Sequence, residues 1–109
     1  MSLTGATLVW LDFNPQAGHE HAGRRPAFVL SPQSYNRKTS LMLCCPITSQ
    51  VTGYPFGVPV EGVIGVRGVI LSDQVKSLDW QVRRAEMRGK VSKDVLEEVV
   101  LKIRALLEG

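Results

Sequence analysis

The chain has 109 residues, of which 44% are hydrophobic and 21% are charged, and its formal net charge is +3. This length predicts one domain over residues 1–109, and the composition excludes a disordered chain. No apolar run reaches the ~18 residues of a membrane-spanning helix, and no basic segment followed by an apolar one opens the chain. We therefore expect no signal peptide, no membrane partner and a cytoplasmic location. The positive charge is compatible with a polyanionic partner but does not by itself indicate nucleic acid.

The first half of the chain predicts three short strands. A run rich in β-branched and aromatic residues ends at a proline, which cannot donate to a strand ladder. Two further apolar runs follow, separated by a segment that begins with a proline and suits one helical turn. The expected elements are strands over Thr7–Phe13, Ala27–Ser31 and Leu41–Thr48, one helical turn over Pro32–Asn36, and a basic exposed bend at Arg37 and Lys38.

The second half predicts more strands and then one helix. Residues Phe56–Glu61 alternate apolar with polar or small residues, and Pro59 argues for an edge position. Gly68–Ser72 is a short buried strand, Asp73–Leu78 a strand end or turn, and Arg83–Val91 a last strand. Ser92 is a suitable N-cap for an amphipathic helix that ends at Gly109. We expect its apolar stripe to pack against the sheet, with a partner surface as the alternative; the stripe is Leu96, Val99, Val100, Ile103, Leu106 and Leu107.

Five or six strands followed by one helix favour a mainly β (α+β) fold. Strands that do not alternate with long helices argue against a parallel sheet. We expect a small antiparallel barrel or a strongly bent sheet with the C-terminal amphipathic helix against it.

The two cysteines, Cys44 and Cys45, are adjacent within the third predicted strand. Neighbouring strand residues point to opposite faces, so a disulfide between them is not expected. No CxxC spacing is present, so the cysteines offer no zinc site. We interpret them as two small buried hydrophobic residues.

The stretch Gly18–Pro26 carries an acid, two imidazoles and two arginines between two predicted strands. Loops of this kind often hold binding or catalytic groups, although an ordinary solvated hairpin loop is the alternative. A strand would place His19 and His21 on one face, but Glu20 would then point the other way, so we expect no metal and no cofactor.

The residues that suit phosphate chemistry are Glu20, Arg25 and Thr48. A guanidinium fits a phosphate, a threonine hydroxyl donates to a phosphoryl oxygen, and a carboxylate or imidazole accepts a proton from a ribose 2′-hydroxyl. Together they would support RNA cleavage by internal attack. The structural alternatives are that Arg25 pairs with Asp12 or Asp73, that Thr48 satisfies a strand-end amide, and that Glu20 is merely solvated.

The chain resembles the MazF/PemK toxins of bacterial toxin–antitoxin pairs, and within them the MazF branch. Each matching motif is short, but their order and spacing are specific. The motifs are Val9–Pro15, Gly18–Leu30 with its E-x-A-G-x-R-P core, Ser31-Pro32, Tyr35-Asn36, Cys45–Gln50, Gly53–Phe56 and Asp73–Ser77.

This resemblance implies a ribosome-independent, metal-independent endoribonuclease that cuts single-stranded RNA, including mRNA. It also implies an SH3-like β-barrel, a homodimer and a cognate antitoxin that blocks the RNA groove. By position, Arg25 and Thr48 match the family's catalytic pair, and Glu20 matches the acid of the MazF branch.

The predicted RNA contacts are Phe13, for which a core position is the alternative, and Gln50, Lys76 and Arg83. The sequence departs from the family at two positions. Leu71 stands where the PemK branch has an arginine, so Asp73 stays a secondary acid–base candidate. Thr52 stands where some MazF members have a lysine, so the recognised RNA sequence is expected to differ.

Two alternatives come from other functional classes. One is a toxin-like barrel that binds a protein target such as gyrase, and the other is an inactive RNA-binding module. Neither would need Glu20, Arg25 and Thr48 together.

Overall fold

The computed structural model describes residues 5–13, 24–49, 53–63 and 66–109. Within these ranges it has seven strands and two helices. In chain order they are β1 (Thr7–Asp12), β2 (Arg24–Val29), α1 (Gln33–Thr39), β3 (Leu41–Thr48), β4 (Gly57–Val63), β5 (Val66–Leu71), β6 (Lys76–Asp79), β7 (Glu86–Lys90) and α2 (Lys93–Glu108).

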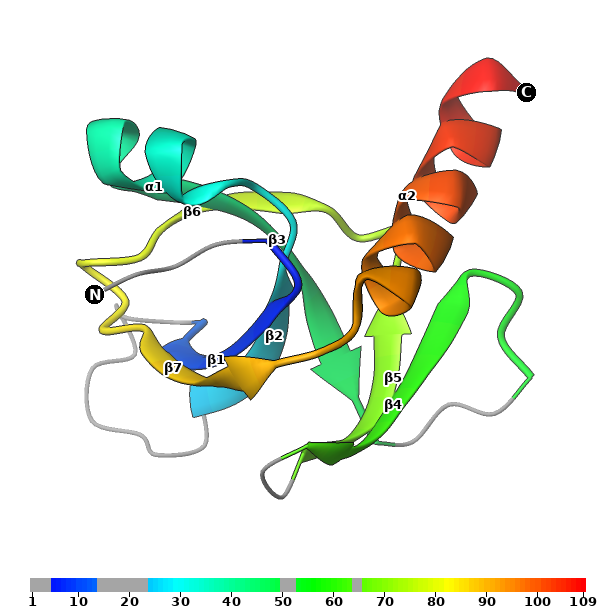
Figure 1. The fold of residues 1–109 in the computed structure, drawn as a ribbon, viewed down its shortest axis with the longest axis horizontal. Helices are drawn as coiled ribbons and strands as arrows, with labels where there is room; N and C mark the ends of the chain where they lie inside the picture. Colours follow the sequence, from blue (N-terminus) through cyan, green and yellow to red (C-terminus); the bar gives the residue numbers. More distant parts are fainter. Residues whose placement is uncertain (1–4, 14–23, 50–52, 64–65) are drawn as a thin grey trace.

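All the strand pairs in the described ranges are antiparallel. The order across the sheet is β4-β5-β3-β2-β1-β7, and β6 pairs with β3 beside β5. Figure 1 shows the strands curling into an open half-barrel, with α1 beside β6 and α2 above β4 and β5. The expected bent antiparallel sheet with a C-terminal helix is confirmed. No helix in the described part of the chain is long and apolar enough to cross a membrane.

The second strand begins three residues earlier than the sequence predicts and ends two residues earlier. β1 and β2 pair without interruption from Thr7 opposite Val29 to Asp12 opposite Arg24, so both arginines that precede Pro26 belong to β2. The reason is an ion pair at the end of this ladder, where the Arg24 Nη1 lies 3.1 Å from the Asp12 Oδ1. The pattern of apolar residues could not predict this start of β2, because an ion pair and not an apolar contact holds it.

The edge position that Pro59 predicts is confirmed, because β4 is the outer strand of its side of the sheet. Val58 and Val60, which flank the proline, are buried as the alternation predicts. The missing amide hydrogen of Pro59 therefore falls on a strand with only one described partner.

The helix α1 is longer than the single turn that the sequence predicts. Arg37 and Lys38 lie in its last turn, not in a bend, and both are exposed. Ser40 ends the helix in the left-handed conformation, with φ of 61°, and its N–H donates to the carbonyl oxygen of Asn36. The buried Asn36 side chain bonds to Ser31, and this fixes the helix on the sheet.

Strand alternation divides the apolar residues between two clusters, one on each face of the sheet. The first cluster contains Phe28 and Cys45 and packs against α2. The second contains Ala27 and Cys44. Both cysteines are buried and free, as expected, and burial raises the pKa of each thiol to about 12.

The C-terminal helix packs on the sheet with only part of its apolar surface. It begins after Ser92 as predicted, although the serine side chain makes no capping hydrogen bond. Val99 is fully buried, and Leu96 and Ile103 pack against the first cluster. The expectation that the whole stripe is core is wrong, because the later turns extend beyond the strands (Figure 1). The large apolar side chains exposed on α2 are Val100, Leu101, Leu106 and Leu107.

The segment between β3 and α2 also differs from the expectation. Lys76–Asp79 forms a separate strand, β6, and the last strand begins at Glu86 and not at Arg83. The Asp79 carboxylate accepts hydrogen bonds from the amides of Gln81 and Val82, both at 2.9 Å. This side-chain bonding holds the turn that precedes β7.

Candidate active site

Arg25 and Thr48 lie on the same face of the sheet. On a β-strand, residues separated by an even number of positions point to the same face. Arg25 is therefore on the face of Ala27, and Thr48 is on the face of Cys44. Both of these belong to the second cluster. β2 and β3 pair with Ala27 opposite Pro46. The ladder ends at this pair, and Arg25 and Thr48 each lie two residues beyond it on the same face. Two side chains that share one face at the end of a ladder can act on one phosphate.

Lys76 and Phe13 border the same face. Lys76 pairs with Cys44 across the β3–β6 ladder, and its side chain is exposed. Phe13 follows β1 and packs partly buried against the second cluster. The face therefore offers two exposed cations, Arg25 and Lys76, with a half-buried hydroxyl and an aromatic ring. Such a set can bind a phosphodiester and an adjoining base.

Arg83 is engaged with the backbone at the end of β1. Its Nη1 donates to the carbonyl oxygen of Phe13 at 2.5 Å and to that of Asp12 at 3.2 Å. The side chain is half-buried. In this geometry Arg83 holds the segment that carries Phe13, and its role as an RNA contact stays a prediction.

A cluster of four charged residues on the opposite face was missed by sequence reasoning. Arg24 donates to the Asp12 carboxylate at 3.1 Å, to the Glu86 carboxylate at 2.5 Å and to the Arg84 carbonyl oxygen at 2.8 Å. The Arg84 Nε donates to the other Asp12 oxygen at 3.0 Å. Of these partners, only the position of Asp12 at a strand end was visible in the sequence.

This cluster engages the side chain of Arg24 and leaves that of Arg25 outside it. Arg24 is held on one face by two carboxylates, so strand alternation directs Arg25 to the other face. Among the described residues Arg25 forms no ion pair. Asp12 binds Arg24 and Arg84, and Asp73 accepts a hydrogen bond from the Tyr54 hydroxyl. The described residues therefore give no support to a structural pairing of Arg25 with either aspartate.

Thr48 owes its position partly to a glycine on the neighbouring strand. A Cβ atom at Gly68 would lie 2.6 Å from the Thr48 carbonyl oxygen and 2.9 Å from the Ile47 Cγ2. Only glycine permits β5 to approach the end of β3 this closely. The sequence marked Gly68 only as the start of a strand.

Several candidates from the sequence lie outside the described residues. They are Glu20, His19, His21, Gln50 and Thr52. Within the described ranges, no group of three or more His, Cys, Asp or Glu side chains is placed to hold a metal ion.

Comparisons with known proteins agree on one family. The sequence model of the PemK-like, MazF-like toxins of type II toxin–antitoxin systems matches residues 6–107. The chain is 48% identical over 100 residues to the endoribonuclease toxin MazF of Escherichia coli K12, covering 92% of this chain and 89% of that protein. It is 37% identical over 108 residues to the endoribonuclease toxin ChpB of the same strain, covering 93% and 90%.

Solved structures give the same result. MazF of Deinococcus radiodurans superposes with a TM-score of 0.87 at 51% identity, covering 100% of this chain and 99% of that chain. A MazE–MazF complex of the same organism contains a chain that superposes with a TM-score of 0.89 at 50% identity, covering 99% and 98%. The half-barrel with its C-terminal helix is thus the fold of these structures.

We predict that Gly68→Ala destabilises the protein by about 1–3 kcal/mol, because the new methyl group meets backbone and not a flexible side chain. Urea unfolding measures this change. The matched control is Arg67→Ala, which truncates an exposed neighbour on the same strand and should change stability by less than about 0.5 kcal/mol. Equal stability of the two variants would contradict the prediction.

We also predict that the charge cluster stabilises the fold at neutral pH and not in acid. Hydrogen bonding to Arg84 and Arg24 lowers the pKa of Asp12, and hydrogen bonding to Arg24 lowers the pKa of Glu86. A lowered carboxyl pKa adds stability above the ordinary carboxyl range, and this stability is lost as pH falls through the folded-state pKa.

The test compares the wild type with Asp12→Asn by urea unfolding across pH. We expect the wild type to be more stable at about pH 7, and we expect this difference to shrink as pH falls through the lowered folded-state pKa of Asp12. A difference that stays constant with pH would show that the charge of Asp12 is not what stabilises the cluster.

Proposed function

Because the chain belongs to the PemK-like, MazF-like toxin family of type II toxin–antitoxin systems, we propose that it is an endoribonuclease toxin that cleaves single-stranded RNA, including mRNA, and arrests growth. It acts at short sequences, without a metal ion or cofactor, and a cognate antitoxin neutralises it. The observation that carries this proposal is the placement of Arg25 and Thr48 on one face of adjacent strands. The 48% identity to a protein named as an endoribonuclease toxin supports the same reaction.

In the proposed mechanism the ribose 2′-oxygen attacks the adjacent phosphorus. The P–O bond to the 5′-oxygen of the next nucleotide breaks, which leaves a 2′,3′-cyclic phosphate and a 5′-hydroxyl end. Arg25 neutralises the charge that builds up on the phosphoryl oxygens, and Thr48 donates a hydrogen bond to one of them. Glu20 accepts the 2′-hydroxyl proton or positions the RNA, and Arg25 is the candidate to protonate the leaving oxygen.

The RNA follows the face that carries these residues. Lys76 contacts a phosphate, because it is exposed beside the second cluster. Phe13 stacks on an unpaired base while Arg83 holds the backbone on which the ring is mounted. Gln50 is the remaining contact from the sequence and follows Thr48 by two residues.

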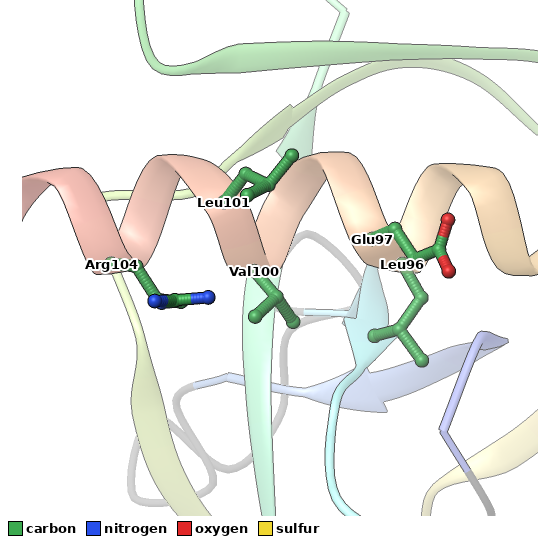
Figure 2. A pocket seen from close by; sticks show the side chains of 5 residues that line it. All are labelled: Leu96, Glu97, Val100, Leu101 and Arg104. Atoms are coloured by element: carbon green, nitrogen blue, oxygen red, sulfur yellow. The ribbon is translucent and has the colours of Figure 1, made fainter.

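A homodimer is the proposed assembly, with the exposed apolar part of α2 as its interface. A groove on this helix is lined by Leu96, Glu97, Val100, Leu101 and Arg104. In Figure 2, Leu96, Val100 and Arg104 form one row along the helix, and Leu101 projects on another side. Leu101 is 61% exposed and Leu107 is 80% exposed, which is costly for a helix that stays in water.

A cognate antitoxin is the second proposed partner. MazF of Deinococcus radiodurans, which shares this fold, has been crystallised with MazE. We further propose a cytoplasmic location, where a toxin meets mRNA, and a single toxin domain over residues 1–109, which the family match over residues 6–107 supports.

We predict that Arg25→Ala and Thr48→Ala each lower the rate of RNA cleavage by about 100-fold or more, because each removes a group that stabilises the phosphoryl charge. The assay uses a long single-stranded RNA in EDTA, and removing divalent ions should leave the wild-type rate unchanged. Arg37→Ala is the control, since it removes an exposed arginine on α1 outside the site.

Near wild-type rates for Arg25→Ala and Thr48→Ala would end this mechanism. Cut ends that bear a 2′,3′-cyclic phosphate support it. RNA left intact by the wild type would favour the protein-binding toxin or the inactive RNA-binding module.

We predict that Leu101→Asp shifts the protein from dimer to monomer, because it places a charge in the proposed apolar interface. Sedimentation velocity measures the change at matched concentrations. The control is Val82→Asp, which alters a side chain of similar exposure, 64%, in the turn before β7. If both variants stay dimeric, the interface lies elsewhere.

A further inference from the structure

Two segments that flank the candidate site are tied to each other by a side-chain hydrogen bond. The loop that follows β3 includes Tyr54, whose hydroxyl donates to the Asp73 carboxylate in the turn that follows β5. The Ser72 amide donates to the Phe56 carbonyl oxygen at 3.0 Å, which adds a backbone bond between the same two segments. We call residues 53–56 and 72–74, with these two bonds, the loop latch.

The Tyr54 ring is held by its neighbours as well as by Asp73. It packs edge-on against Phe56, with ring centroids 6.1 Å apart and an interplanar angle of 68°. The Gly57 amide donates to the Tyr54 carbonyl oxygen at 3.0 Å, which closes a turn. The Lys102 Nζ of α2 donates to the Pro55 carbonyl oxygen at 2.8 Å. The tyrosine is therefore a fixed donor and not a freely rotating surface side chain.

The latch joins the segment before β4 to the turn between β5 and β6, the strand that carries Lys76. Thr48 is the last residue of β3, and the loop with Tyr54 follows it. Lys76 is the first residue of β6 and follows Asp73 by three residues. The β3–β6 ladder ends at the pair of Cys44 with Lys76, so it does not reach the Thr48 end of β3. The hydrogen bond of Tyr54 to Asp73 ties the turn before β6 to the segment that precedes β4.

The carboxylate of Asp73 is already committed to a donor. Hydrogen bonding to Asp73 raises the pKa of Tyr54, so the hydroxyl keeps its proton and the carboxylate remains the acceptor. Leu71 stands two residues earlier, at the position where the PemK branch, which this chain resembles, has an arginine. Both observations fit a structural acceptor better than a proton carrier.

We propose that Tyr54 and Asp73 are a positioning pair for RNA cleavage, in which the carboxylate acts by holding the tyrosine and transfers no proton. This inference rests on the proposed function. It assigns Tyr54 a role that the sequence did not indicate, and it replaces the acid–base role considered for Asp73.

The test is a double-mutant cycle with Tyr54→Phe, Asp73→Asn and the double variant. Tyr54→Phe keeps the ring and removes only the donor, and Asp73→Asn removes the charged acceptor. We expect each single variant to lower kcat/KM for RNA cleavage by about tenfold, the size of one hydrogen bond to a charged group. We expect the double variant to be no worse than Tyr54→Phe, because without the hydroxyl donor the change at Asp73 has no bond left to weaken.

Two matched controls come from elsewhere on the surface. Tyr35→Phe removes the hydroxyl of a tyrosine that is 37% exposed, against 36% for Tyr54, and whose hydroxyl makes no hydrogen bond within the described ranges. Asp94→Asn removes one negative charge from the exposed first turn of α2. Both controls should cleave RNA at the wild-type rate.

The pH profile of kcat separates a positioning role from proton transfer. We expect all three variants to keep the limbs of the wild-type profile at a lower plateau. A loss of 100-fold or more in Asp73→Asn with Tyr54→Phe near wild type, or a limb missing only in Asp73→Asn, would overturn the proposal.

If the wild type leaves RNA intact, the proposed function fails, and amide hydrogen exchange tests the latch by itself. Faster exchange at Ser72 and Gly57 in Tyr54→Phe than in Tyr35→Phe would support the latch. Equal exchange in the two variants would overturn it.

Discussion

The organisation of this molecule depends on β3, which has neighbours along both of its edges. One edge pairs with β2, and the other pairs with β6 and then with β5. A strand bordered in this way has one register available, because a slip by one residue would exchange its two faces. Cys44 and Cys45 mark those faces, each within a separate apolar cluster. The position of Thr48, at the end of the same strand, follows from the register that the apolar residues impose.

A cluster of ion pairs closes the end of the β1–β2 ladder, where the apolar residues end. The β1–β2 ladder closes with Asp12 opposite Arg24, and Arg84 and Glu86 arrive from the other end of the chain to complete the cluster. Each ion pair of the cluster adds a modest amount to stability at neutral pH. The cluster also holds the Arg24 side chain on one face of the sheet. Because adjacent strand residues point to opposite faces, the Arg25 side chain lies on the other face. The two adjacent arginines therefore have different roles.

The sequence predicted those parts of the fold that depend on local pattern. β1, β3 and α2 lie where apolar alternation or helical spacing placed them, and Pro59 correctly indicated an edge. The start of β2 and the separation of β6 were missed, because each depends on partners distant in the chain. For the same reason the sequence identified Arg25 and Thr48, by their phosphate chemistry and by resemblance, but not their common face. Nor did it show the close approach at Gly68 or the bond of Tyr54 to Asp73, since no periodicity encodes either contact.

The burial of the two adjacent thiols has a practical consequence. With a pKa of about 12, neither cysteine offers thiolate to a modifying reagent while the sheet is closed. Cys45 lies in the first apolar cluster and Cys44 in the second. The labelling rates of the two thiols would therefore report separately on local opening of the two clusters. The chain thus contains a pair of internal reporters for local opening, one for the layer beneath α2 and one for the layer beneath Arg25.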